Sequence, residues 1–241
     1  METSTELFNI ETIKRLNETF EMEYVKNAIK QDFITFDIGA NIGIYSLLLS
    51  DLVGPKGHVY AFEPNKDLFR VKKENVTLIN VAVSEKAGKG KLYLCKTNNG
   101  DGRIFFSSSD PNRKTMDIDI IKIDDFIDNN DINRLDFVKI DIQGSEPLAI
   151  KGMANALKKF SPIVFTEFWP YGYNLAGFKS VEFIGIMHEL GYRHRVIENT
   201  CTQKDKTFNP YSIDYLLEKS QMTDDWTANL IWKKQGDWNG R

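Results

Sequence analysis

Cysteine, excess positive charge and long apolar runs are all scarce in this sequence. The chain of 241 residues holds two cysteines, Cys95 and Cys201, which lie far apart and form no C-x-x-C pair. This spacing argues against a zinc site and a disulfide framework, and it fits a reducing compartment. The formal net charge is −3 and the pI is about 5.7. The chain therefore lacks the basic face with which nucleic-acid binders neutralise phosphates.

No apolar run reaches the length of a membrane-spanning helix, about 18 residues or more. The first residues, METSTELFNIETIK, have neither the cationic start nor the apolar core of a signal peptide. We therefore expect a cytoplasmic protein that does not bind membranes. Histidine is scarce as well, and His58, His188 and His194 are not spaced like metal ligands, so we expect structural roles for them.

What the sequence does contain is a nucleotide-binding pattern between residues 33 and 64. The segment FITFDIGANIGIYSLLLSDLVGPKGHVYAFEP begins with a strand-like run, 33–37, turns at Gly39 and Gly43, and continues as a leucine-rich helix. A second strand-like run follows at 58–62 and ends in Glu63. This order predicts a strand, a tight turn, a helix whose first N–H groups face a ligand, and an acid that binds ribose hydroxyls.

The glycine spacing distinguishes between two nucleotide cofactors. A dinucleotide site would read G-x-G-x-x-G, whereas this turn reads DIGANIG and keeps one glycine of that triplet in spacing. Asp37 precedes the turn, and an acid fits a cationic ligand better than a diphosphate. The turn therefore favours S-adenosylmethionine, which carries a sulfonium and an ammonium group. The alternative is that Gly39 and Gly43 only allow close packing of helix on strand, and that Asp37 caps the helix.

Strand-like and helix-like segments alternate along the rest of the chain. This alternation predicts an α/β fold with a mostly parallel sheet and helices on both faces. Residues 4–30 carry apolar positions at helical spacing, and we expect this extension to pad the sheet rather than to cover a substrate pocket. Further helices are expected at 43–52, 65–74 and 180–190 and from residue 146, and strands at 77–81, 136–140, 163–166, 192–197 and 228–232, with strand-like runs at 91–95 and 117–123 around a polar loop.

Four sequence blocks together resemble one enzyme family. DIGANIGIYS, AFEP, NVAVSEKAG and DFVKIDIQGSEPLAIKGMANAL, in this order, are similar to the FkbM-type S-adenosylmethionine-dependent methyltransferases over about residues 33–167. The resemblance implies a Rossmann-like class I methyltransferase fold with a seven-stranded sheet, whose last strand runs antiparallel beside 192–197. The length of the chain and the lack of a Pro-, Gly- or Ser-rich linker predict one domain, 1–241, made of a helical extension (1–30), a cofactor-binding core (33–167) and a C-terminal part of the same sheet (168–241).

Ligands of open α/β sheets bind at the carboxyl ends of the strands, and acids stand at four such ends in this sequence. We expect Asp37 to face the methionine ammonium through water or backbone, and Glu63 to accept both ribose hydroxyls. Ala82 either lies beside the adenine or only packs in its strand. The predicted cofactor-binding residues are Asp37, Gly39, Ala40, Asn41, Gly43, Glu63, Pro64, Ala82 and Asp141.

The acceptor side is expected to hold the catalytic residues Asp141, Glu146 and Glu167. An alcohol must lose its proton to accept a methyl group, and Asp141 is the best candidate base, with a pKa raised by burial and by the other two acids. The same three carboxylates could instead hold Mg²⁺. The sequence leaves both mechanisms open, and Glu146 could simply cap its helix. For Lys139 we expect pairing with an acid rather than catalysis.

Three functions are compatible with these patterns. The resemblance implies methyl transfer, most often to a hydroxyl of a small molecule or sugar, and this is the favoured function. A nicotinamide-dependent oxidoreductase and a non-catalytic S-adenosylmethionine-binding module are the alternatives. The aromatic loop FWPYGY at 168–173 either forms a wall of the acceptor pocket or packs on the surface. The sequence identifies neither the acceptor nor the oligomeric state.

Overall fold

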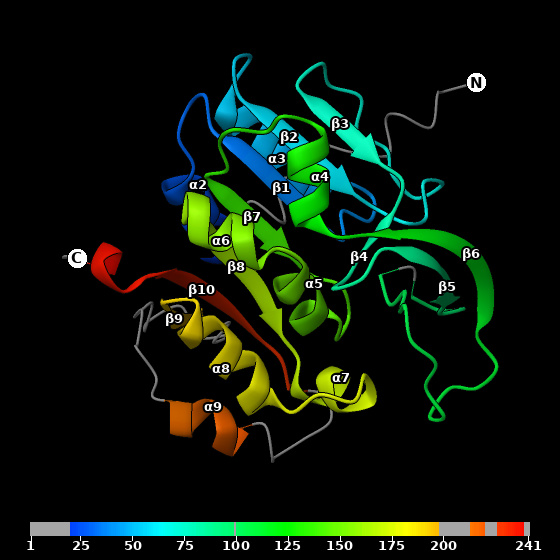
Figure 1. Ribbon diagram of the computed structural model, residues 1–241. Helices are drawn as coiled ribbons and strands as arrows, with labels where there is room; N and C mark the ends of the chain where they lie inside the picture. The colour runs from blue at the N-terminus through cyan, green and yellow to red at the C-terminus, as the bar shows by residue number, and fades with distance from the viewer. Residues whose placement is uncertain (1–19, 99, 198–212, 220–225, 239–241) are drawn as a thin grey trace.

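A computed structural model of the chain describes residues 20–98, 100–197, 213–219 and 226–238. Its centre is a seven-stranded sheet with the order β3-β2-β1-β7-β8-β10-β9 (Figure 1). The strands are β1 (Ile34–Ile38), β2 (His58–Phe62), β3 (Val76–Ile79), β7 (Phe137–Ile140), β8 (Ile163–Phe168), β9 (Tyr192–Ile197) and β10 (Ala228–Lys234).

The sheet is parallel from β3 to β8, and β10 runs antiparallel between β8 and β9. This confirms the mostly parallel seven-stranded sheet and the antiparallel last strand beside 192–197. Strand order reverses at β1, which has β2 on one side and β7 on the other. A crevice therefore opens at the carboxyl ends of β1 and β7, where open α/β sheets bind their ligands.

Helices cover both faces of the sheet, as the alternation of segments predicts. On one face lie α4 (Ile123–Asn129), α5 (Glu146–Gly152), α6 (Ala154–Phe160) and α8 (Ser180–Glu189), and on the other α2 (Phe20–Ala28) and α3 (Ile44–Val53). The period-two alternation of β7 serves both faces, because Val138 and Ile140 join one apolar core while Phe137 joins the other. Two short helices, α7 (Pro170–Leu175) and α9 (Ile213–Lys219), and a 3₁₀ turn, η1 (Gln235–Trp238), complete the described chain.

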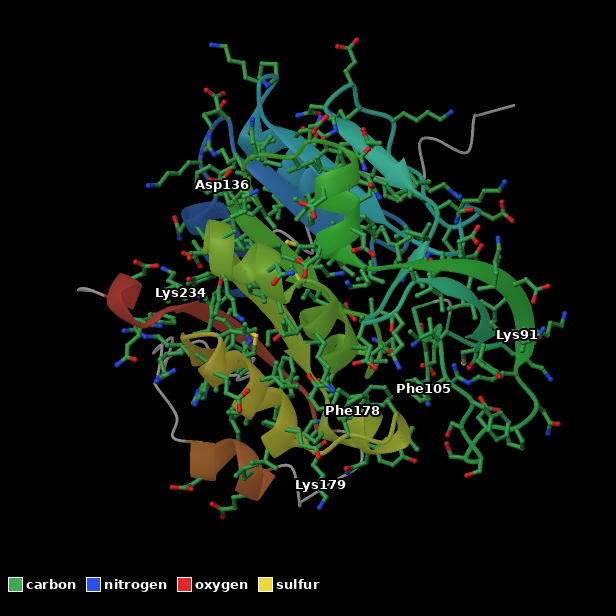
Figure 2. All side chains as sticks on the ribbon, in the orientation of Figure 1. Lys91, Phe105, Asp136, Phe178, Lys179 and Lys234 are labelled. Carbon is green, nitrogen blue, oxygen red and sulfur yellow. The ribbon has the colours of Figure 1, made fainter. Side chains whose placement is uncertain are left out.

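A second, three-stranded sheet stands beside the first. It has the order β4-β6-β5 and consists of β4 (Ala82–Val83), β5 (Gly88–Leu94) and β6 (Lys114–Ile121). The two strand-like runs of the sequence thus form an antiparallel pair, β5 with β6. Figure 2 shows Lys91 at the outer side of this lobe, at the opposite end of the molecule from Lys234.

The helix expected at 65–74 is absent, and that prediction was wrong. This segment forms turns and irregular backbone. The N–H of Arg70 donates to the carbonyl oxygen of Ile42, so the segment is bonded to the glycine turn instead of to itself. Phe69 and Val71 then pack against the bare face of Gly43. Tertiary contacts with the turn have overridden the local preference for a helix.

Two further expectations need correction. The loop expected after residue 168 contains α7, which begins at Pro170, a residue favoured in the first turn of a helix. The strand expected at 77–81 ends at Ile79, and the chain then enters the second sheet. Of the helical extension expected at 4–30, α2 is confirmed, whereas residues 1–19 lie outside the described residues. Among the helices that the structure describes, none combines the length and apolarity needed to cross a membrane.

Candidate active site

A cavity of about 280 Å³ lies at the carboxyl ends of β1, β2 and β7. Its walls come from the turn after β1, the end of β2, the first residues of β4, the loop after β7 and one side of the second sheet. This volume is close to the lower end of the range of small-molecule sites, about 300–1,000 Å³. The cavity occupies the crevice that the strand order creates.

The floor of the cavity depends on a glycine at position 39. Gly39 has a left-handed φ of +78°, and a β-carbon added to it would lie 1.9 Å from the carbonyl oxygen of Asp141. The N–H groups of Gly39 and Ala40 both donate to the carbonyl oxygen of Phe62. The glycine turn is therefore fixed against β2 and lies directly on the loop after β7.

Glu63 fastens the same turn from the end of β2. Its Oε2 accepts the N–H of Asn41 at 2.8 Å and its Oε1 accepts the N–H of Asn65 at 2.8 Å. Burial raises the pKa of Glu63, against the opposing effect of these two hydrogen bonds. Each carboxylate oxygen has a second lone pair, so Glu63 can accept further hydrogen bonds from a ligand in the cavity. The Oδ1 atom of Asn41, in the same wall, is buried and has no hydrogen-bond partner among the residues that the structure describes.

Asp37 is fully buried and is not among the described residues that line the cavity. Its Oδ2 accepts the hydroxyl of Ser46 at 2.6 Å, and its Oδ1 lies 3.3 Å from Nζ of Lys139. Lys139 also donates to the carbonyl oxygen of Gly39 at 2.8 Å. Burial alone would lower the pKa of Lys139, but Asp37 and Asp141 hold it above its usual value. The pairing expected for Lys139 is thus confirmed.

Three carboxylates converge at the loop after β7, beside the cavity. Asp141, Glu146 and Glu167 each bring one oxygen to within 4.8 Å of the other two. Asp141 lines the cavity and its side chain is 41% exposed. Glu146 is buried, and its two oxygens accept the N–H groups of Ile142 and Gly144. Glu146 therefore shapes the loop that carries Asp141.

A neutral side chain links two of these acids. Nε2 of Gln143 donates to Asp141 at 3.0 Å and lies 3.2 Å from an oxygen of Glu167. Gln143 has a left-handed φ of +57°, which aims its side chain along the loop after β7. Gln143 was not among the predicted site residues. The adjoining Gly144, at φ +96°, was the one available signal of an unusual backbone there.

Close approach of the acids changes their proton affinities. Burial raises the pKa of Glu146 to about 7, with a smaller contribution from Asp141. Burial also raises the pKa of Glu167 to about 9, with Asp141 and Glu146 adding to the effect. Burial and the neighbouring acids thus favour the protonated form of Glu167, and a proton can be shared in hydrogen bonds within the cluster.

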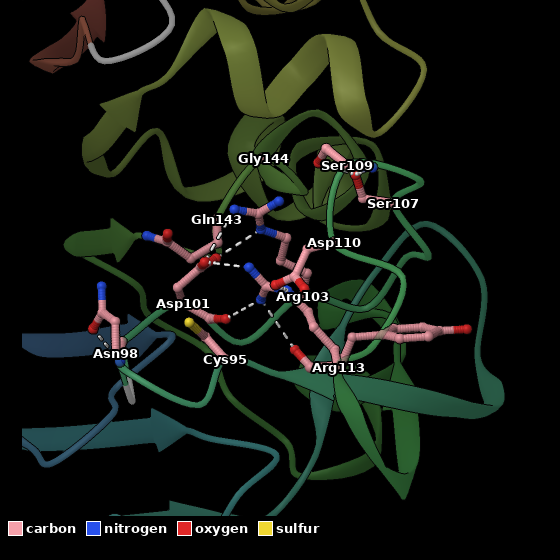
Figure 3. A network of polar contacts seen from close by, with 12 residues as sticks. Cys95, Asn98, Asp101, Arg103, Ser107, Ser109, Asp110, Arg113, Gln143 and Gly144 are labelled. Carbon is pink, nitrogen blue, oxygen red and sulfur yellow. Dashed lines mark hydrogen bonds and ion pairs between the residues drawn. The ribbon is translucent and has the colours of Figure 1, made fainter.

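Side chains of the polar loop between β5 and β6 form a network of ion pairs. Asp101 binds the guanidinium groups of both Arg103 and Arg113, and Figure 3 shows it between the two arginines. The guanidinium of Arg103 lies 4.9 Å from the ring centre of Trp169 in the aromatic loop. Asp101 also contributes to the raised pKa of Glu167. The network therefore borders the acid cluster.

The same loop forms one wall of the cavity through its alternating backbone. Gly100, Gly102 and Ile104 line the cavity, whereas the intervening Asp101 and Arg103 join the ion-pair network. In an extended segment, successive side chains point to opposite sides. The ion pairs of Asp101 and Arg103 thus fix the backbone whose neighbouring residues line the cavity.

The N-terminal extension also reaches the cavity. Glu21 and Met22 of α2 line it beside Tyr45 of α3. Glu21 accepts a hydrogen bond from Asn229 at 2.9 Å, which attaches α2 to β10. Val25 meanwhile packs into the apolar core. The expectation that this segment pads the sheet rather than covering a pocket was wrong for α2, because α2 packs on the sheet and also lines the cavity.

The predicted cofactor-binding residues fall into two groups. All but Asp37 and Gly43 line the cavity, and Gly43 instead packs on Phe69 and Val71. Of the predicted catalytic acids, Asp141 lines the cavity while Glu146 and Glu167 stand beside it.

The histidines lie elsewhere. His58 forms a hydrogen bond with Thr77, and the rings of His188 and His194 stack on each other. The residues brought together at the cavity are Gly39, Ala40, Asn41, Glu63, Pro64, Ala82 and Asp141.

A sequence model of the methyltransferase FkbM domain matches residues 37–194. The chain belongs to the FkbM methyltransferase family. The match begins at Asp37 and includes the glycine turn, Glu63 and the three acids described above. Membership of this family favours methyl transfer over the nicotinamide-dependent alternative.

Similar proteins include one curated relative and several solved structures. The hexuronic acid methyltransferase AglP of Haloferax volcanii is 27% identical over 143 residues, which are 56% of this chain and 56% of AglP. A candidate rRNA methylase of Clostridium thermocellum has a TM-score of 0.51 and 14% identity, over 89% of this chain and 93% of its own. The FkbM methyltransferase of Methylobacillus flagellatus has a TM-score of 0.47 and 17% identity, over 96% of this chain and 56% of its own. The first of these structures supports the Rossmann-like methyltransferase fold.

Proposed function

We propose that this FkbM-family methyltransferase transfers the methyl group of S-adenosylmethionine to a hydroxyl group of a sugar or another small molecule. The observation that carries the proposal is that Glu63 and Asp141 line one cavity, which could hold a nucleoside at the first acid and an acceptor at the second. AglP, whose name is hexuronic acid methyltransferase, supports a sugar acceptor. The aligned region spans little more than half of AglP, so its acceptor is a guide to the class of compound only.

Glu63 is the residue proposed to bind the ribose. Its oxygens are held in place by two backbone N–H groups and face the cavity with free lone pairs. The base would then lie in the apolar section beside Ala82, which includes Leu92 and Leu94 of the second sheet. The amino-acid tail would extend toward the glycine turn and Asp141. Asp37 acts behind the wall, where it keeps Lys139 in position, and it does not contact the ligand in this proposal.

Methyl transfer is an in-line displacement, in which the acceptor oxygen forms a bond to the methyl carbon as the bond from carbon to sulfur breaks. Alignment of the two reactants lowers much of this barrier. Asp141 would take the proton of the acceptor hydroxyl, because it is the acid of the cluster that lines the cavity. Gln143 would orient Asp141 by its hydrogen bond of 3.0 Å, with Glu167 at its other end.

The donor set of Asp141, Glu146 and Glu167 is also chemically suited to Mg²⁺, which prefers carboxylate oxygens. A bound Mg²⁺ would supply acidification of the acceptor hydroxyl. The hydrogen bonds that both oxygens of Glu146 accept from backbone N–H groups favour the metal-free base. We therefore propose Asp141 as the base.

An assay with isotopically labelled S-adenosylmethionine tests the function. A panel of hexuronic acid glycosides and matched neutral hexosides would be offered to the purified chain, and methylated product would be identified by mass spectrometry. Asp141→Asn preserves the shape of the side chain and should lower turnover by roughly 10²–10⁴-fold. Asp51→Asn, at an exposed carboxylate of α3, is the matched control and should leave turnover unchanged.

The same assay separates the two mechanisms. Turnover that survives a chelator supports the base, whereas loss of turnover that Mg²⁺ restores supports the metal. Binding of the cofactor without methylation of any acceptor would instead favour the non-catalytic binding module. Near wild-type turnover by both Asp141→Asn and Glu167→Gln would remove the acid cluster from the mechanism.

A further inference from the structure

Ser145 lies directly before α5, in the wall of the cavity, and carries a buried hydroxyl. The residue is 0% exposed, and its Oγ has no hydrogen-bond partner among the described residues. It occupies the position before the helix, but its side chain makes no capping hydrogen bond. A buried hydroxyl without a partner costs free energy, so a ligand that supplies one is the simplest reason for its presence.

The neighbours of Ser145 indicate which part of a ligand it would meet. Ala82, Val83 and Ile142 line the same cavity, and the N–H of Ser145 donates to the carbonyl oxygen of Ile142. This part of the wall is apolar and suits a flat ring rather than a charged tail. Glu63, the proposed ribose acid, lines the same cavity and follows the end of β2.

We propose that the Ser145 hydroxyl forms a hydrogen bond with the purine edge of the cofactor and so fixes the orientation of the base. This inference rests on the proposed function, because it assigns a residue to the adenine of S-adenosylmethionine. The hydroxyl can donate to a ring nitrogen or accept from the exocyclic amine, and either bond gives it its missing partner. Ser145 is thus a residue that determines specificity for the base.

Two opposite effects of Ser145→Ala follow from this role. Without ligand, the variant should have an equal or higher melting temperature, because it removes an unpaired buried hydroxyl and no capping bond. With S-adenosylhomocysteine, its affinity should be roughly threefold to tenfold weaker, the factor expected from one neutral hydrogen bond. A merely structural serine would lower the melting temperature and leave the affinity unchanged.

Ser50→Ala is the matched control. Ser50 is also buried, at 3% exposure, but its Oγ donates to Asn75 at 2.7 Å and it lies outside the cavity wall. The control should therefore lower the melting temperature and leave the affinity for S-adenosylhomocysteine unchanged. The two serine variants are expected to show reversed patterns.

Calorimetry and thermal unfolding of the full chain test the inference, with S-adenosylhomocysteine and 5′-methylthioadenosine as probes. The second probe has the base and ribose but no amino-acid tail, so Ser145→Ala should weaken both probes by a similar factor. Unchanged affinity for S-adenosylhomocysteine in Ser145→Ala, or a weakening absent with 5′-methylthioadenosine, would overturn the inference. Failure of the wild-type chain to bind S-adenosylhomocysteine would instead contradict the proposed function itself.

Discussion

The carbonyl oxygen of Asp141 occupies the space where Gly39 would carry a side chain, 1.9 Å from the position of a β-carbon. The glycine turn after β1 and the acidic loop after β7 can approach each other only because residue 39 has none. The two loops that border the cavity, one after β1 and one after β7, therefore meet through their backbones.

Gly39→Ala should separate these two loops. The added methyl group meets a carbonyl oxygen, and the left-handed φ of +78° is unfavourable for alanine, so we expect a loss of roughly 2–4 kcal/mol in the free energy of unfolding. The control is Gly185→Ala in α8, where a β-carbon meets nothing within 4 Å. It should stabilise the protein by about 0.5–1 kcal/mol. Urea unfolding that shows equal stability for the two variants would contradict this account of the turn.

Lys139→Met should destabilise the protein through its partner. The substitution leaves Asp37, which is fully buried, without its ion pair, at a cost of roughly 3–5 kcal/mol in the free energy of unfolding. The double variant Asp37→Asn with Lys139→Met should recover part of this loss, because no uncompensated charge remains. Strictly additive losses in a double-mutant cycle would show that the two residues do not interact.

Glu167 should make the protein less stable as the pH rises into the alkaline range. Because its pKa is raised in the folded protein, the folded state holds this proton more tightly than the unfolded chain does. The contribution to stability is full below the ordinary glutamate pKa and is lost as the pH rises toward about 9. Glu167→Gln should therefore lose less stability than wild type over this range. Parallel curves for the two proteins in urea unfolding at several pH values would refute the raised pKa, with exposed Glu189→Gln as the control.

Glu63→Gln tests the ribose acid. The variant keeps the shape of the side chain but loses charge-assisted hydrogen bonds to the ribose, each contributing roughly 1.5–3 kcal/mol. The affinity for S-adenosylhomocysteine should fall about tenfold or more in a folded protein. Glu74→Gln, at an exposed position in the following segment, should bind as wild type does. Equal affinities of both variants would remove Glu63 from the cofactor site.

The central sheet could be predicted from the sequence because its signals are local. The strands β1, β2 and β8 are short, largely apolar runs, and the glycine turn with Glu63 at the end of β2 defines the first βαβ unit. The sheet from β1 to β10 follows the expected alternation, and β9 has the predicted bounds, 192–197. The spacing of the apolar residues along the chain predicts which segments form these strands and helices.

The parts that could not be predicted depend on contacts between distant segments. Residues 65–74 form no helix because Phe69 and Val71 pack on Gly43, which their own sequence does not reveal. The Asp101 network was hidden in a polar loop, and Gln143 looked like an ordinary turn residue. Polar side chains acquire such roles only through their partners in space.

Calorimetric titration of the wild-type chain with S-adenosylhomocysteine, and separately with NAD, tests the central claim most directly. The cavity has an acid for a ribose and a turn without the spacing for a pyrophosphate, so we predict saturable binding at a single site for S-adenosylhomocysteine and none for NAD. Binding of NAD with no binding of S-adenosylhomocysteine would contradict the account.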